Sequence, residues 1–173
     1  MEADKIKKEK FLEEISKIDP STIVYIDESG VDEGICSDRG WSKKGKPLLA
    51  KKIGKYYVRT NIIAGLVNNK SIAPTVFNGT CNTEFFNRWV EKILLPELKA
   101  GQTVIMDNAA FHKSKKTREL IESAHCKLIF LPPYSPDLNP IEKFWANMKR
   151  WLKQKINNFT NLYDAFCSFF QYT

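Results

Sequence analysis

Long apolar segments are missing from this sequence of 173 residues. No run approaches the roughly 20 apolar residues that a membrane helix requires. The N-terminus, MEADKIKKEKFLEEISKIDP, is charged throughout and has no apolar signal-peptide core. Internal repeats and low-complexity segments are absent as well. These absences predict a cytoplasmic protein that does not enter a membrane, and the length suits one compact domain.

Paired cysteines are missing too. The four cysteines, Cys36, Cys81, Cys126 and Cys167, include no CxxC pair, and this spacing does not fit a zinc knuckle. A reducing compartment would keep them as free thiols. We therefore interpret them as structural residues.

Positive charge, in contrast, is in excess and unevenly placed. The net charge is +7; residues 38–59 carry eight Lys or Arg against Asp38 alone, and residues 143–155 carry five against none. Contacts to nucleic-acid phosphates would explain both basic segments, although a solvated surface would explain either one.

The first half of the chain reads as a helix followed by strands. Residues 4–18 suit a helix that Pro20 ends. Residues 22–30 form a buried strand by composition and reach Asp27 and Glu28 at its end. The predicted continuation is a second strand over 34–42, a third over 56–67, and a further strand or extension over 71–77.

The second half alternates helices and strands. Helices are predicted over 82–98, 114–124 and from Asn139 to about Ile156, with a short apolar helix over 161–170. Strands are predicted over 102–107, where the run stops at Asp107, and over 126–132. The order is three strands, helix, strand, helix, strand, helix, which predicts an α/β fold with a mixed five-stranded sheet flanked by helices.

Three carboxylates lie at element ends in this prediction: Asp27, Asp107 and Glu142. Sites form where strand ends and helix starts converge, and three carboxylates held together require cations to offset their repulsion. Hard oxygen ligands suit Mg²⁺ or Mn²⁺. Two such ions about 3.5–4 Å apart support phosphoryl transfer, here on nucleic acid.

Each of these residues also has a structural interpretation. Asp27 and Asp107 are equally typical of turns, and Glu142 occupies the third helical position after Asn139, where it would complete a capping box. Glu28 competes with Asp27, but the alternation of a strand places it on the opposite face. His112 is typical of a loop histidine. Spacing alone leaves these alternatives open.

The strings IDESG, MDNAAFH and LPPYSPDLNPIEKFW resemble the three signature blocks of mariner-like transposases, in particular those of bacterial insertion sequences within the DDE integrase and transposase superfamily. Between Asp107 and Glu142 lie 34 residues, the spacing typical of that group. The segment RGWSKKGKP resembles a further block. The resemblance extends over roughly residues 22–169.

The resemblance implies a ribonuclease H-like catalytic domain over 21–173, preceded by a charged helix or linker over 1–20. It implies that Asp27, Asp107 and Glu142 are catalytic and bind two Mg²⁺ or Mn²⁺ ions. It further implies cleavage of double-stranded DNA at transposon ends and transfer of the freed strand into target DNA, in the bacterial cytoplasm at the nucleoid.

Other positions follow from the same resemblance. Asn108 and His112 are expected to orient water or a phosphate beside Asp107. Arg39, Lys43 and Lys44 are expected to contact DNA, with Trp41 either a DNA contact or a core residue. Lys149 is expected to contact a DNA phosphate because it lies one heptad beyond Glu142, near the same face of the helix. Trp145, Met148 and Leu152 have helical spacing, and we assign them to packing.

Full-length members of that family carry N-terminal helix-turn-helix domains, which residues 1–21 are too short to hold. We expect a separately encoded helix-turn-helix part as partner, and a homodimer in the transposition complex. The alternative function is a catalytically silent remnant that binds DNA or a full-length transposase and interferes with transposition. Generic ribonuclease H activity is a third possibility.

Overall fold

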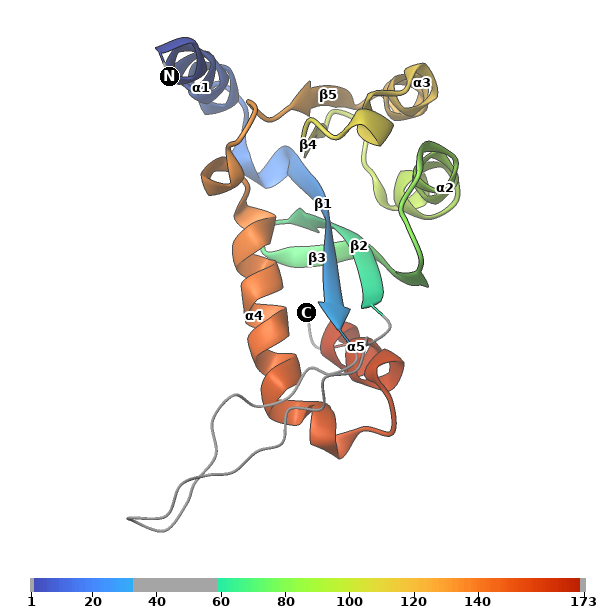
Figure 1. Cartoon of the computed structure of the whole chain (residues 1–173). Helices are drawn as coiled ribbons and strands as arrows, with labels where there is room; N and C mark the ends of the chain where they lie inside the picture. The colour runs from blue at the N-terminus through green and yellow to red at the C-terminus, as the bar shows by residue number, and fades with distance from the viewer. Residues whose placement is uncertain (1, 33–58, 172–173) are drawn as a thin grey trace, which may run out of the picture.

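A five-stranded sheet forms the centre of the molecule in the computed structural model, which describes residues 2–32 and 59–171 (Figure 1). The strands are β1 (Ile23–Asp32), β2 (Arg59–Val67), β3 (Lys70–Asn78), β4 (Thr103–Met106) and β5 (Lys127–Phe130). Their spatial order is β3-β2-β1-β4-β5. The first three pair antiparallel, whereas β4 and β5 run parallel to β1. The predicted mixed five-stranded sheet is confirmed.

Helices cover both faces of the sheet (Figure 1). They are α1 (Glu2–Ser16), α2 (Thr83–Trp89), α3 (Lys115–Ser123), α4 (Pro140–Lys155) and α5 (Leu162–Gln171). Asn82 and Ser114 cap α2 and α3 as the sequence predicts, each accepting a hydrogen bond from the backbone N–H three residues on. No helix within the described ranges is long and apolar enough to cross a membrane.

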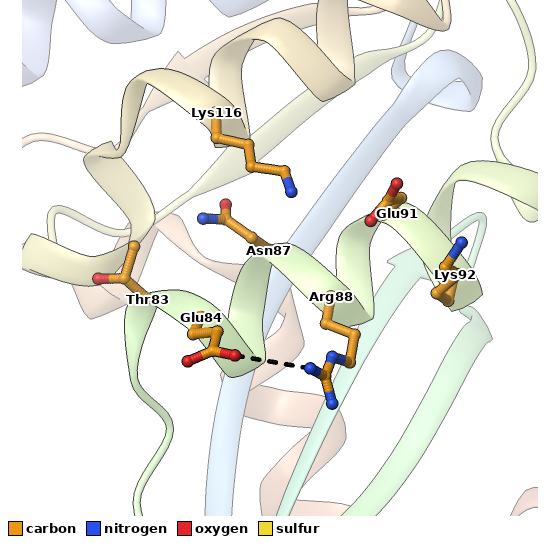
Figure 2. Close-up of a pocket in the computed structure, with 7 residues that line it drawn as sticks. All are labelled: Thr83, Glu84, Asn87, Arg88, Glu91, Lys92 and Lys116. Carbon is orange, nitrogen blue, oxygen red and sulfur yellow. Dashed lines mark ion pairs between the residues drawn. The ribbon is translucent and has the colours of Figure 1, made fainter.

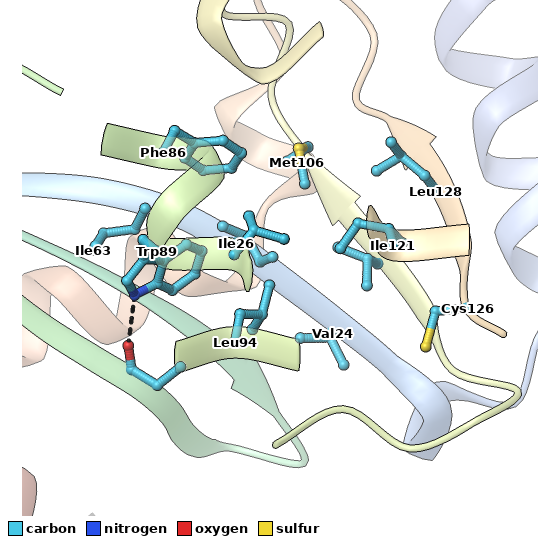
Figure 3. Packing of buried hydrophobic residues seen from close by; sticks show 13 residues of the cluster. Val24, Ile26, Ile63, Phe86, Trp89, Leu94, Met106, Ile121, Cys126 and Leu128 are labelled. Atoms are coloured by element: carbon cyan, nitrogen blue, oxygen red, sulfur yellow. Dashed lines mark hydrogen bonds between the residues drawn. The ribbon is translucent and has the colours of Figure 1, made fainter. Parts of the chain in front are cut away.

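The alternation of side chains along β1 sends neighbouring residues into different layers. Val24 and Ile26 pack with α2 and α3, in the cluster that Figure 3 shows around Phe86 and Trp89. The opposite face of the sheet packs against α4 and α5 around the fully buried Trp145 and Phe166. A third, smaller cluster joins Phe11 of α1 to Ile23, Ile105, Ile129 and Leu131.

Two strand predictions change. The predicted second strand at 34–42 lies outside the described residues, and the strands that follow β1 are the segments predicted as third and fourth. Asp27 was predicted at a strand end, but β1 continues to Asp32 because Glu28–Asp32 pairs with β2. The strand tolerates two adjacent acidic residues because each has hydrogen-bonding partners on its own face.

The predicted helix over 82–98 is regular only as far as Trp89. Residues Val90–Leu94 widen into a π-helical turn, where the Leu95 N–H donates to the Val90 carbonyl, and Leu95–Glu97 form a 3₁₀ turn. Pro96 explains this change, because its ring would collide with the carbonyl four residues earlier in a regular helix.

Candidate active site

The parallel pairing of β1 and β4 brings the two aspartates to neighbouring positions. Ile26 is opposite Met106 in the register, so Asp27 and Asp107 each follow directly after that pair. Asp107 lies just beyond the end of β4, whereas Asp27 is held inside β1. Residues that are 80 positions apart in the sequence thus lie on neighbouring chain segments, where β1 passes the C-terminal end of β4.

The third carboxylate is positioned by α4. Glu142 is the third residue of this helix, and Trp145 lies one turn further on. The Trp145 indole Nε1–H donates to Asp27 Oδ2 at 3.3 Å, which fixes the first turns of α4 against β1. Trp145 was predicted to pack only; it is buried in the core as predicted and also contacts a candidate catalytic residue.

The three carboxylates line one hollow of about 280 Å³. The rest of its lining comes from Asn108 and from the proline-rich segment between β5 and α4, including Leu131, Pro132, Pro133, Tyr134, Ser135, Pro136 and Asn139. Within the ranges that the structure describes, no three acidic, His or Cys side chains are arranged so that they could hold one ion together. The carboxylates therefore share a hollow without forming a closed coordination sphere.

Negatively charged carboxylates are crowded together in the hollow, and this crowding affects their pKa values. Burial raises the pKa of Asp27 to about 7, and the charges of Glu142 and Glu28 act in the same direction. Asp107 differs, since its pKa is lowered: burial opposes this shift, but hydrogen bonds from His112 and from the Ala109 N–H outweigh it. A proton or a cation is thus most strongly favoured beside Asp27.

His112 lies behind the hollow and does not line it. Its side chain is fully buried, with Nδ1 2.6 Å from Asp107 Oδ1 and Nε2 3.0 Å from Glu28 Oε1. Burial alone would lower the pKa of His112, but the hydrogen bonds and charges of the two carboxylates raise it to about 9. Both ring nitrogens face carboxylate oxygens, which accept hydrogen bonds, so both nitrogens act as donors.

The other predicted site residues have different positions. Asn108 lines the hollow, and its amide Nδ2 donates to the Leu131 carbonyl, which ties the end of β4 to the proline-rich segment. Lys149 lies two turns along α4 from Glu142 and does not line the hollow. Arg39, Trp41, Lys43 and Lys44 fall outside the described residues. The functional roles of all these residues stay predictions.

Two residues that line the hollow were not predicted as site residues from the sequence. Tyr134 is 95% exposed at its rim, in a left-handed backbone conformation with φ of 53°. Asn139 was predicted to cap α4, but its side chain makes no capping bond, and its buried Oδ1 has no partner among the described residues. The sequence signal that could have identified Tyr134 is an aromatic residue surrounded by prolines. No local sequence pattern shows that the Asn139 Oδ1 lacks a hydrogen-bond partner.

A larger hollow of about 560 Å³ lies between α2 and α3 (Figure 2). Its charged residues are of both signs, and Glu84 pairs with Arg88 on the same helix at 3.5 Å. Because it lacks converging carboxylates from separate elements, its chemistry does not match the predicted site. The smaller hollow remains the candidate.

Comparisons with known proteins show the family and the fold of the chain. The family described as DDE superfamily endonuclease matches residues 22–163. A protein of Sinorhizobium fredii, y4pE/y4sA, is 38% identical over 58 residues, which are 33% of this chain and 41% of that protein. The Tcb2 transposase of Caenorhabditis briggsae is 40% identical over 47 residues, 27% of this chain and 17% of that protein. Each match thus covers less than half of the relative.

Solved structures of the Mos1 transposase share the fold. Its strand transfer complex superposes with a TM-score of 0.69 at 19% identity, over 87% of this chain and 47% of that one. Its paired-end complexes with Mg and with Mn give TM-scores of 0.66 and 0.64 at 17% and 18% identity. They cover 86% and 84% of this chain and 48% and 46% of theirs. The predicted ribonuclease H-like fold is thereby confirmed.

Proposed function

We propose that this chain, which belongs to the DDE superfamily endonucleases, is the catalytic domain of a DNA transposase. It would cut phosphodiester bonds at transposon ends and join the freed 3′-hydroxyl to target DNA. The observation that carries this proposal is the meeting of Asp27, Asp107 and Glu142, from three separate elements, in one hollow.

The donor set fits two divalent cations. All three side chains offer carboxylate oxygens, which suit Mg²⁺ and Mn²⁺. Two ions can each be held by a pair of carboxylates, so no single group of three is needed. The raised pKa of Asp27 reflects its burial first and then the uncompensated charges of Glu142 and Glu28, which a cation would offset. Mos1 complexes containing Mg and Mn support the same choice.

When bound, the cations would supply Lewis acidity that activates a water or a 3′-hydroxyl and stabilises the leaving oxygen. The chain's own residues supply position. Trp145 fixes one oxygen of Asp27 by a hydrogen bond. The Ala109 N–H and His112 both donate to Asp107 Oδ1, so Oδ2 would be the oxygen offered to a cation. Glu142 is exposed on the first turn of α4. It lines the hollow from this helix, whereas Asp27 lines it from β1 and Asp107 from the end of β4.

DNA is the proposed substrate, and a structure of the Mos1 transposase paired-end complex with a transposon end supports it. The net charge of +7 suits a polyanion. We assign phosphate contacts to Lys149 and, in the basic segment before β2, to Arg39, Lys43 and Lys44. The proposed active form is a homodimer that pairs two DNA ends, working with helix-turn-helix DNA-binding domains encoded in the same or a separate chain.

A nicking assay tests the proposal. Purified chain, supplied with a helix-turn-helix partner, is incubated with DNA carrying the terminal repeat, in Mg²⁺, Mn²⁺ or EDTA. We expect divalent-dependent cleavage and joining that disappear in Asp107→Asn, while Asp137→Asn, an exposed aspartate paired with Lys8, keeps full activity. DNA binding without cleavage in the wild-type chain would overturn the proposal and favour the silent, interfering remnant.

A further inference from the structure

Three hydrogen-bonded side chains, those of Glu28, His112 and Asp107, connect β1 to the carboxylate hollow. Glu28 Oε1 accepts a hydrogen bond from His112 Nε2 at 3.0 Å, and His112 Nδ1 donates to Asp107 Oδ1 at 2.6 Å. Glu28 adjoins Asp27 in the sequence but projects from the other face of β1. The two neighbours on one strand therefore reach the same site by different routes, Asp27 directly and Glu28 through His112.

The His112 ring, which is the middle of these three side chains, cannot rotate freely. It packs against two aromatic rings, with centroid distances of 4.4 Å to Phe86 and 4.3 Å to Phe111. Its side chain is completely buried. Since both nitrogens are engaged and the ring is buried against Phe86 and Phe111, the imidazole is held in one orientation by these core residues and not by the hollow.

Glu28, the side chain on the far side of His112 from Asp107, is also held in place. The Glu28 side chain is 19% exposed, and its Oε1 also lies 3.9 Å from the Cys81 Sγ, whose thiol donates. Burial and the charge of Glu28 raise the pKa of Cys81 to about 12, so this cysteine stays a neutral donor. Glu28 is thus a fixed acceptor, anchored in the strand that also carries Asp27.

We propose that Glu28 and His112 form a positioning pair, which orients Asp107 so that its Oδ2 faces the cation in the carboxylate hollow. Neither residue contacts the substrate or the cation. This inference rests on the proposed function of the hollow, and it replaces the expectation that His112 itself orients water or a phosphate. Partners of this kind behind a metal ligand typically change metal affinity about 10–100-fold when removed.

Amide substitutions can separate the two bonds of His112. The amide nitrogen of Asn roughly replaces Nδ1 of a histidine, and that of Gln roughly replaces Nε2. His112→Asn should keep the bond to Asp107, His112→Gln should keep only the bond to Glu28, and His112→Phe should keep the ring packing with neither bond. His125→Asn is the matched control, because His125 is exposed at the end of α3 with φ of 56°, where Asn is well tolerated.

The primary readout is Mn²⁺ affinity of the purified chain by calorimetry, with circular dichroism and thermal melting to confirm folding. We expect His112→Gln and His112→Phe to weaken Mn²⁺ binding about 10–100-fold, His112→Asn to weaken it about threefold or less, and His125→Asn to match the wild type. Glu28→Gln should weaken binding in the wild-type background but add nothing in His112→Phe, because residues acting as a unit are not additive.

The outcomes distinguish this pair from the proposed function. Wild-type Mn²⁺ affinity in a folded His112→Phe chain, or equal losses in His112→Asn and His112→Gln, would overturn the positioning pair. Wild-type chain that binds Mn²⁺ but never cleaves DNA would instead count against the proposed function. If the wild type bound no Mn²⁺, a crystal structure of His112→Phe would still decide the positioning role, since an unchanged Asp107 side chain would refute it.

Discussion

At the scale of residues, the two aspartates of the hollow have opposite electrostatic situations. Asp27 is 9% exposed and faces uncompensated negative charge, whereas Asp107 has two hydrogen-bond donors on one oxygen. The pKa of Asp27 is raised to about 7 and that of Asp107 is lowered. Without a cation, the charge of Asp27 therefore opposes folding, as is common where function requires crowded like charges.

This difference predicts that Asp27→Asn stabilises the metal-free protein. The folded-state pKa of Asp27 lies above its ordinary value of 3.8, so its contribution to stability falls as pH rises from about 4 to about 7. At pH 8 we expect Asp27→Asn to raise Tm by a few degrees, since each 1 kcal/mol of stability gained corresponds to about 2–4 °C in a domain of this size. The advantage should vanish at pH 4. Thermal melts in EDTA measure it.

Asp137→Asn is the control for this experiment. The pKa of the exposed Asp137 is lowered by its hydrogen bond from Lys8, so its replacement should not raise Tm at pH 8. Added Mg²⁺ should raise the Tm of the wild type more than that of Asp27→Asn. A Tm for Asp27→Asn below that of the wild type at pH 8 would contradict the electrostatic interpretation.

At the scale of elements, the proline-rich segment and the start of α4 determine where the third carboxylate lies. Pro140 occupies the first position of α4, where its missing N–H costs nothing. The Leu131 carbonyl, at the start of the segment, is tied to Asn108 next to the second aspartate. Each residue of a helix is rotated by about 100° from the last. Glu142 therefore faces the hollow only if α4 begins at Pro140.

A charge swap tests this geometry without changing composition. Glu142→Lys combined with Lys143→Glu keeps the net charge and the helix but moves the carboxylate by about 100° around α4. We expect nicking to fall to the background seen with EDTA, with unchanged circular dichroism. The control swap, Arg118→Glu with Glu119→Arg, lies on exposed positions of α3 and should keep full activity. Retained cleavage in the α4 swap would exclude Glu142 as a ligand.

At the scale of the whole molecule, α1 packs onto the strands that carry the site. Phe11 is 5% exposed in the cluster with Ile23, Ile105 and Ile129, and Lys8 pairs with Asp137 of the proline-rich segment at 3.0 Å. The sequence assigned residues 1–20 to a separate charged helix or linker. Whether that division is correct depends on how much this packing stabilises the fold.

Substitution of Phe11 measures that contribution. If α1 belongs to the folded body, Phe11→Ala should lower the free energy of unfolding by about 3–5 kcal/mol, as expected for a buried aromatic residue. Leu12→Ala is the matched control, since Leu12 is 45% exposed on the same helix and should change stability by about 0.5 kcal/mol or less. Equal small effects in urea denaturation would support a separate linker.

The sequence by itself determined the order of the strands and helices that the structure describes and the caps of α2 and α3, and it marked Asp27, Asp107 and Glu142 as candidates through their resemblance to known motifs. The elements and caps follow from local rules, because periodicity, capping side chains and proline positions are readable along one chain. The length of β1 was not readable, because Asp27 and Glu28 look like the end of a strand until their partners are known.

Only the tertiary structure decided which of these residues meet. The partners of Asp27 and Glu28, Trp145 and His112, lie 118 and 84 positions away, and no local pattern announces a hydrogen bond over that distance. The same packing places His112 behind the hollow, against Asp107 and Glu28, and leaves Asn139 without its capping bond. Secondary-structure propensity depends on residues that are neighbours in the sequence. Burial and hydrogen bonding between side chains depend on which distant residues the folded sheet brings together.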